Sequence, residues 1–327
     1  MLTRMISEKF HHLTEWVVPA IGEDTWRSLM ILAVMAVLMA LESTFARTDR
    51  RARDYRQSYL ANFGVLFFND ALLSLLSVGS LWLIASHYAG WGLLSSLQDV
   101  GVKALLSFVL LDLTLYLWHR ANHRFDWLWR FHKVHHSDIV MNVSTAFRLH
   151  FVEVFLTALV KAMFIVAVGV DASIVMANEA LITLCVLFHH ARIQVPGERL
   201  LARVAIMPYL HRTHHSAARA EHDSNYGAVF TLWDRWFGTL SEAEPAVIGL
   251  HNVPGQNLLE LLKFGFMPNT PAMPGPSSPS PEGLRRMIAE AAYYRAEKRG
   301  FAPGDELRDW IEAERECRSL HPQSPSR

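Results

Sequence analysis

Long stretches without a charged side chain constrain the fold of this chain more than any other feature of its sequence. Ala71–Trp91 contains no aspartate, glutamate, lysine or arginine, and neither does the shorter run Ser28–Leu41. Three further apolar runs are each broken by one charged residue: Ala104–Trp118, Val154–Val170 and Ala172–Phe188. A helix needs about 20 mostly apolar residues to cross a bilayer. We therefore predict an all-α, multi-pass membrane bundle with about four or five transmembrane helices. For the last three runs, buried helices of a large soluble protein are the alternative.

The placement of arginine predicts how the chain is oriented in the membrane. The loop Ala46–Arg56 (ARTDRRARDYR) is rich in arginine and should therefore be cytoplasmic. From this anchor two helical hairpins leave the cytoplasmic surface and return to it, one near Trp118 and one near Phe188. The second hairpin turns at Gly169–Ala172 (GVDA). The central histidines then all lie on the cytoplasmic side.

Charge and cysteine content exclude several classes of protein. The 31 basic and 31 acidic residues balance, so no electrostatic attraction to nucleic acid is expected. The two cysteines, Cys185 and Cys317, form no CxxC pair, which argues against a disulfide framework and against a thiolate zinc site.

The chain divides into three parts by composition. We predict a membrane-embedded domain over residues 1–266, a proline-rich linker over 267–281 and a small helical tail over 282–327. Apolar residues in the tail recur at helical spacing. The tail resembles DUF2934, a short helical module of unknown function.

Histidine spacing predicts a metal centre. HRANH contains two histidines four residues apart. HKVHH and HRTHH each contain such a pair and one more histidine between its two members. Residues at these spacings share one face of a helix. Eight clustered imidazoles would cost desolvation unless a metal accepted their lone pairs. The eight motif histidines are His119, His123, His132, His135, His136, His211, His214 and His215.

The number of ligands predicts two ions. One zinc ion takes three or four protein ligands, whereas two octahedral ions leave room for eight or nine nitrogens and a bridging oxygen species. Imidazole suits iron, zinc, copper and nickel alike, so ligand type does not choose the metal. We include His190 as a ninth ligand and leave open whether His150, His189 and His222 are ligands.

Three carboxylates in the apolar runs are candidates for supporting roles. Asp112 precedes His119 by two helical turns on the same face, and it could orient a ligating imidazole. A polar contact between helices is its alternative role. Glu153 and Glu179 could each offset the charge of metal ions held by neutral ligands.

The motifs resemble a known family. LDLTLYLWHRANH, LWRFHKVHHS, MPYLHRTHHS, DSNYG and WDRWFGT, within residues 105–240, are similar to the fatty acid hydroxylase superfamily, also called the sterol desaturase family. HHSDIVMNVSTAFR resembles the alkylglycerol monooxygenases of that superfamily. After the histidine that matches His190, the family has Ser-Asn where this chain has Ala191-Arg192.

The resemblance implies a membrane enzyme with a histidine-ligated di-iron centre. It implies two Fe²⁺ ions, held by the eight motif histidines and His190, that use O2 to hydroxylate or dehydrogenate a C–H bond of a lipid. The expected substrate is a fatty acyl chain, an ether lipid or a sterol drawn from the bilayer. No flavin or nicotinamide motif occurs, so the electrons should come from a separate donor protein or a reduced pterin.

Two other functions remain open at the level of sequence. A membrane zinc enzyme could hydrolyse a lipid ester or amide through metal-activated water, without O2 or a reductant. A metal transporter would need ligands at bilayer depth, whereas these histidines cluster at the ends of the apolar segments.

Overall fold

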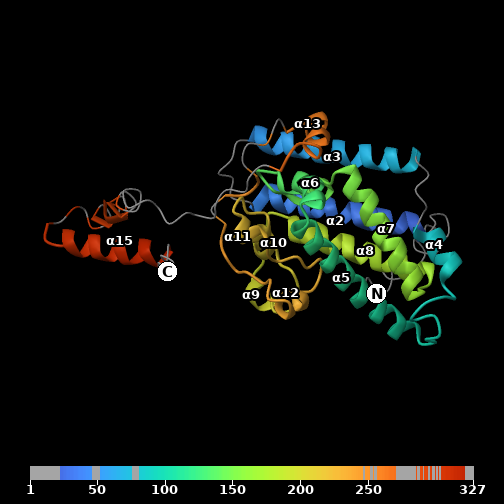
Figure 1. Ribbon diagram of the computed structural model, residues 1–327. Helices are drawn as coiled ribbons and strands as arrows, with labels where there is room; N and C mark the ends of the chain where they lie inside the picture. The colour runs from blue at the N-terminus through green and yellow to red at the C-terminus, as the bar shows by residue number, and fades with distance from the viewer. Residues whose placement is uncertain are drawn as a thin grey trace, which may run out of the picture. The chain divides into compact units, whose positions relative to one another are not determined.

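Helices make up nearly all of the regular structure. The computed structural model describes residues 23–45, 52–75, 81–245, 247–250, 253, 256–269 and 303–320, with scattered positions between 285 and 301. Within these residues there is no β-strand, only two isolated bridges, Ala205–Phe230 and Ser216–Ile248. The predicted all-α class is confirmed (Figure 1).

Three helices are long and apolar enough to cross a membrane. They are α5 (Val100–Arg124), α7 (Phe151–Val168) and α8 (Ala172–His190). Each contains all or nearly all of one predicted apolar run, and the turn predicted at Gly169–Ala172 connects α7, which ends at Val168, to α8. These helices support an integral membrane protein. The total of four or five spans and the side of the membrane stay predictions.

The longest uncharged run, Ala71–Trp91, does not form the single spanning helix that we expected. The first residues of the run belong to the end of α3 (Ala52–Leu75). Residues further along form the short helix α4 (Leu81–Tyr88). Residues 76–80 lie outside the described part of the chain.

The remaining helices pack around the membrane helices. The helix α2 (Glu23–Phe45) packs against α8, and so does α10 (Pro208–His214). The short helices are α6 (Asp126–His136), the 3₁₀ helix η1 (Val143–Phe147), α9 (Glu198–Leu201), α10 (Pro208–His214), α11 (Arg219–His222), α12 (Leu232–Trp236) and α13 (Leu258–Phe264). In Figure 1, α9 to α12 gather on one side of the bundle.

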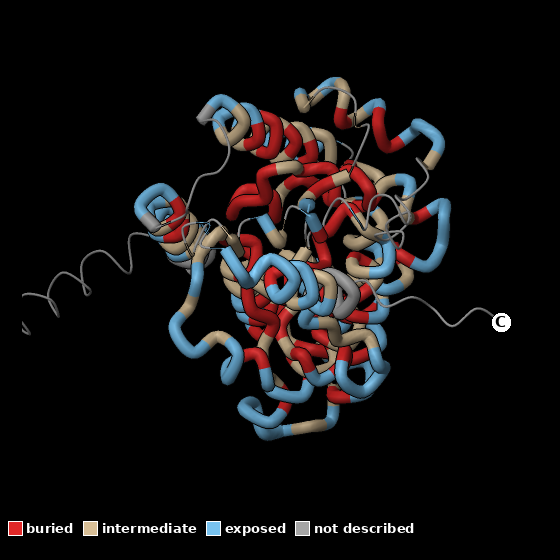
Figure 2. The backbone as a smooth tube through the Cα atoms, turned by 90° about the vertical axis from the view of Figure 1, so that its left-hand side faces the viewer, coloured by how far each residue is buried: buried red, intermediate tan, exposed pale blue. Residues whose placement is uncertain are grey.

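The main core lies between the membrane helices. Phe108 of α5, Ile165 of α7 and Ile182 of α8 are buried in one apolar cluster. Leu105 and Met163 on the same helices are more than half exposed, at 62% and 63%. In Figure 2 the buried segments, in red, run through the interior while exposed segments lie at its edge. An apolar outer surface on such helices suits contact with lipid.

The C-terminal tail is a unit of its own. Contacts between Cα atoms divide the chain into two compact units, Met1–Pro271 and Ala272–Arg327. In the second unit, Ala313 of α15 (Glu306–Leu320) packs with Ile288. The predicted boundaries at 266 and 281 stay predictions, because residues 270–281 lie outside the described part.

We expect Gly169→Ala to destabilise the fold more than the control Gly197→Ala. Gly169 ends α7 with a left-handed φ of +69°, and an added Cβ would lie 1.5 Å from the carbonyl oxygen of Trp91. Gly197 has a φ of +73°, with no atom within 4 Å of that position. Left-handed strain costs both variants roughly 1–2 kcal/mol. Thermal melting in detergent measures the difference, and equal losses would contradict the role of the Trp91 contact.

Candidate metal centre

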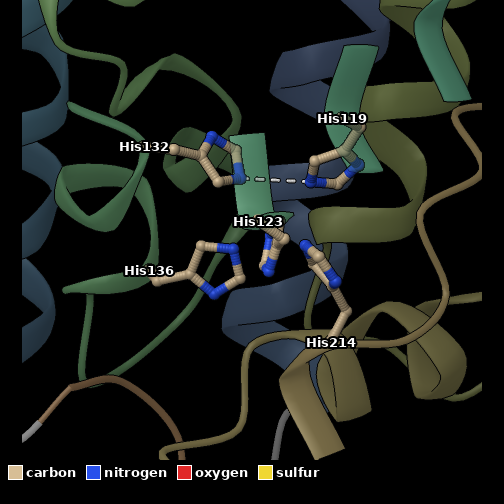
Figure 3. Close-up of side chains that lie close together, drawn as sticks. All are labelled: His119, His123, His132, His136 and His214. Atoms are coloured by element: carbon tan, nitrogen blue, oxygen red, sulfur yellow. Dashed lines mark hydrogen bonds between the residues drawn. The ribbon is translucent and has the colours of Figure 1, made fainter. Parts of the chain in front are cut away.

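The nine histidines predicted as metal ligands lie together in two groups. Within each group the ligand atoms all lie within 4.8 Å of one another. The five-histidine group consists of His119, His123, His132, His136 and His214. The four-histidine group consists of His135, His190, His211 and His215. Figure 3 shows the five-histidine group, whose rings approach one another from α5, α6 and α10.

Helix geometry explains how each HxxHH motif divides its histidines. The two histidines that are four residues apart join one group, and the remaining histidine joins the other. Positions i+3 and i+4 differ by about 100° around a helix, so their side chains point toward different groups. The outer pair of HKVHH, His132 and His136, belongs to the five-histidine group. The outer pair of HRTHH, His211 and His215, belongs to the four-histidine group.

Local sequence signals place the helices that carry the motifs. The helix α5 begins after Asp99, whose side chain accepts a hydrogen bond from the backbone N–H of Val102 at 2.9 Å. Its last two turns carry His119 and His123. Only Phe125 separates α5 from α6, so the first two motifs follow each other closely. The helix α10 has Pro208 in its first turn, where a missing N–H costs little.

The facing ring nitrogens have the spacing of ligands on a metal ion. The Nε2 atoms of His119 and His132 are 3.1 Å apart, and those of His190 and His211 are 3.0 Å apart. Two nitrogens at about 2.1 Å from one ion, at right angles, lie about 3 Å apart. Both ring nitrogens of His136 are buried without a hydrogen-bond partner. The residues therefore fit metal ions.

Burial keeps these imidazoles in the neutral form that binds metals. Outside the membrane helices, desolvation lowers the pKa of five histidines well below its ordinary value, and neighbouring imidazoles lower it further. A neutral imidazole has one lone pair free for an ion. These five are His135, His136, His211, His214 and His215.

Asp112 makes polar contacts with another segment, which is the alternative role that we left open beside orienting an imidazole. Its hydrogen bonds come from the backbone N–H groups of Val229 (2.9 Å) and Phe230 (3.2 Å) and from Nε1 of Trp233 (2.8 Å). Asp112 and His119 share a helix face but lie two turns apart, roughly 10 Å along the axis. The carboxylate therefore anchors the segment before α12 instead.

A carboxylate from another helix contacts the five-histidine group. Oε1 of Glu153, in the first turn of α7, lies 2.7 Å from Nδ1 of His132, and both side chains are buried. Glu179, the other candidate for offsetting charge, pairs with Lys161 at 2.5 Å. Packing of α6 against α7 brings Glu153 to His132. No spacing rule could have identified this contact, because 21 positions separate the two residues.

His150, one of the three histidines left open, caps a helix. Its Nδ1 accepts the backbone N–H of Val152 at 3.2 Å, at the start of α7. Its Nε2 lies 3.1 Å from the carbonyl oxygen of Leu262 and donates to it. Both nitrogens of His150 therefore already have protein partners.

His189 and His222 lie beside the two groups without belonging to either. The ring centroid of His189 is 3.9 Å from that of His211, and its Nδ1 is buried without a partner. Nδ1 of His222 lies 3.0 Å from the carbonyl oxygen of Ser216. Together with His123 and Asp223, His222 forms a smaller set of candidate ligands.

A buried polar network fixes the loop that follows HKVHH. The guanidinium of Arg148 donates to the carbonyl oxygen of Val134 (3.1 Å), to Oγ of Ser137 (2.9 Å) and to Oδ1 of Asn62 (3.1 Å). Burial raises the pKa of Asp138, but the charge of Arg148 and the hydrogen bonds outweigh it, so the net pKa is below its ordinary value. The side chains that donate to Asp138 are Ser58, Asn62 and Thr145.

A cavity of about 310 Å³ borders both groups. Its walls come from α5, α7 and α8, together with the segments around η1 and Tyr226. The ligand candidates in its wall belong to both groups: His119, His132, His135, His190 and His211. Most of the other lining residues are apolar, among them Leu115, Phe147, Ile182, Val186 and Leu187.

Comparison with known families identifies this region. The family model for fatty acid hydroxylases matches residues 104–239, which include every histidine of both groups. Residues 104–239 form a fatty acid hydroxylase domain. This confirms the resemblance inferred from the motifs, and the fatty acid hydroxylase domain carries the whole site. Residues 284–318 match DUF2934, a family of unknown function, as predicted for the tail.

Curated relatives of the fatty acid hydroxylase domain act on lipids. Ornithine lipid hydroxylase OlsE of Rhizobium tropici is 25% identical over 65% of this chain and 66% of its own length. The alkylglycerol monooxygenases of Danio rerio and Homo sapiens are each 28% identical, over 50% and 49% of this chain. The match spans only 36% and 35% of those two enzymes. No solved structure matches the chain.

Proposed function

We propose that this chain is a membrane oxygenase in which two iron ions, held by the nine histidines, hydroxylate or desaturate a C–H bond of a lipid. The reaction would use O2 and external electrons. The fatty acid hydroxylase domain and the lipid hydroxylases among its relatives support this reaction class. The observation that carries the proposal is that both histidine groups border one largely apolar cavity.

The cavity suits a substrate whose reacting carbon carries no polar group. Apolar walls can hold such a carbon near the ions by shape, and they exclude water from the reaction. The lining along α7 consists of the polar residues Glu153, Thr157 and Lys161, whose polar groups already pair with other protein side chains. From Glu153 to Lys161 it spans two helical turns, roughly 12 Å, a length that suits a segment of an acyl or alkyl chain.

The residues of the chain would hold and orient the ions. Bound iron would supply the activation of O2, a chemistry of iron held by nitrogen and oxygen ligands. Neutral imidazoles offer their Nε2 atoms to the ions, and Glu153 fixes the ring of His132 by accepting its Nδ1–H. The Tyr226 carbonyl oxygen, 2.9 Å from Nδ1 of His119, fixes a second ring.

The names of the relatives indicate the substrate class, and the sequence indicates the source of the electrons. The names of the relatives favour the acyl or alkyl chain of a polar lipid, such as an ornithine lipid or an ether lipid; a sterol is a further candidate. A separate donor protein or a reduced pterin would supply the electrons. The arginine-rich loop favours the cytoplasmic side for the histidines.

Conversion of lipids with and without oxygen tests the proposed function. Purified protein in detergent, loaded with Fe²⁺ and given a chemical reductant, is incubated with an ether lipid or an ornithine lipid under ¹⁸O2 and under argon. We expect product carrying ¹⁸O, or an added double bond, only with oxygen. Equal conversion under argon would overturn the proposal and favour a zinc-dependent lipid hydrolase, which uses metal-activated water.

A further inference from the structure

The two histidine groups differ in what surrounds them. In the five-histidine group, four rings have their Nδ1 atoms held by protein oxygens. In the four-histidine group, only one ring does, that of His190, whose Nδ1 lies 2.7 Å from the Val186 carbonyl oxygen. The other three have a buried Nδ1 with no hydrogen-bond partner: His135, His211 and His215.

The oxygens around the five-histidine group include two carboxylates. Oε1 of Glu153 is 2.7 Å from His132, and Oδ1 of Asp223 is 3.2 Å from His123. The carboxylate of Asp223 is itself held by Arg219 at 2.9 Å. No carboxylate in the described part of the chain pairs with a member of the four-histidine group.

Charge makes this difference important for metal binding. A divalent ion held only by neutral imidazoles leaves two positive charges in a buried, poorly solvated site. Two carboxylates hydrogen-bonded to ligands offset that charge, and they make their imidazoles more basic. The carboxylate of Glu153 is buried, and no lysine or arginine of the described chain pairs with it. A metal ion bound in the five-histidine group would offset its charge.

We propose that the two sites hold metal with unequal strength, and that Glu153 and Asp223 are positioning residues that make the five-histidine group the tighter site. This inference rests on the proposed function only in requiring two metal ions. The four-histidine group then loses its ion first. Each outer partner of a ligand is worth about 10–100-fold in metal affinity. Two carboxylates should therefore give the two sites very different metal affinities.

Metal release from the intact, detergent-purified protein tests the inference. The loaded protein is mixed with excess EDTA, and the metal remaining per chain is measured over time by mass spectrometry. We expect two phases, with one ion leaving in each. The variant His211→Ala should lack the fast phase, because only three histidines remain in its group. His136→Ala leaves four histidines and both carboxylates, so it should keep the slow phase but accelerate it.

Glu153→Gln tests the role of the carboxylate. Glutamine can keep the hydrogen bond to His132 but loses the charge, so we expect the slow phase alone to accelerate, by about 10–100-fold. Asp223→Asn provides a second, independent variant if the first fails to fold. The control is Asp171→Asn, a carboxylate paired with Lys103 at the opposite end of α8 from His190, which should change neither phase.

Two outcomes would overturn the inference. One is release of both ions from the wild-type protein in a single phase. The other is equal acceleration of both phases by Glu153→Gln, which would indicate a general structural role. Two-phase release from a protein that converts lipids equally under argon would leave this inference standing while removing the proposed oxygenase function.

Discussion

The variant His136→Ala should bind metal in the five-histidine group more than about 100-fold less tightly and lose more than about 100-fold in lipid oxidation. Loss of an outer partner of a ligand already costs about 10–100-fold in metal affinity or activity, so loss of the ligand itself should cost more. His136 is fully buried, and neither of its ring nitrogens has a partner in the protein. Metal analysis and product formation under air measure the two effects.

A histidine far from the centre provides the control. His87 of α4 is solvent-exposed and belongs to neither group. His87→Ala should keep both ions and full activity. An active His136→Ala protein that retains two ions would remove His136 from the metal centre.

Arg148→Met should destabilise the protein by about 3–5 kcal/mol, because it leaves the buried charge of Asp138 uncompensated. Arg148 is fully buried, and its charge stabilises the ionised carboxylate of the buried Asp138. Methionine leaves that carboxylate without its cation and leaves the carbonyl oxygen of Val134 without a donor. Unfolding in mixed micelles measures the loss in the free energy of unfolding.

Arg130→Met is the matched control, since Arg130 is exposed on α6, a few residues from the same network. A surface substitution of this kind usually changes stability by less than about 0.5 kcal/mol. Equal effects of the two variants would show that the buried network contributes nothing particular to stability.

The ligand candidates were predictable because helix geometry is local. HxxxH and HxxHH place imidazoles on adjacent faces within one or two turns, so spacing alone identified His119 and His123 as neighbours. The same geometry explains why one motif serves both groups. Spacing could not predict which histidines of α6 and α10 share a group, because each helix contributes to both groups.

The supporting carboxylate shows where sequence reasoning reaches its limit. Asp112 and His119 share one helix face, yet their separation along the axis keeps them apart, and Asp112 binds the segment at Val229 instead. Glu153 reaches His132 only because α6 and α7 pack together. Contacts of this kind depend on tertiary packing, which no periodicity in one segment encodes.

The membrane helices illustrate a similar limit. Runs with a single charge formed the long helices α5, α7 and α8, and their charged residues turn out to be partnered, as Lys161 is with Glu179. The run with no charge at all, Ala71–Trp91, is divided between α3 and α4. Which partner a charged residue finds depends on the packing of the helices, and a count of charges does not contain that information.

The most direct test of the central claim is the metal content of protein purified anaerobically from iron-supplemented cells. We predict close to two iron ions per chain in the wild-type protein, and one ion fewer in His211→Ala, which leaves three histidines in its group. Wild-type protein that binds only zinc, or that takes up no stoichiometric metal when Fe²⁺ is added, would contradict a di-iron centre built from these nine histidines.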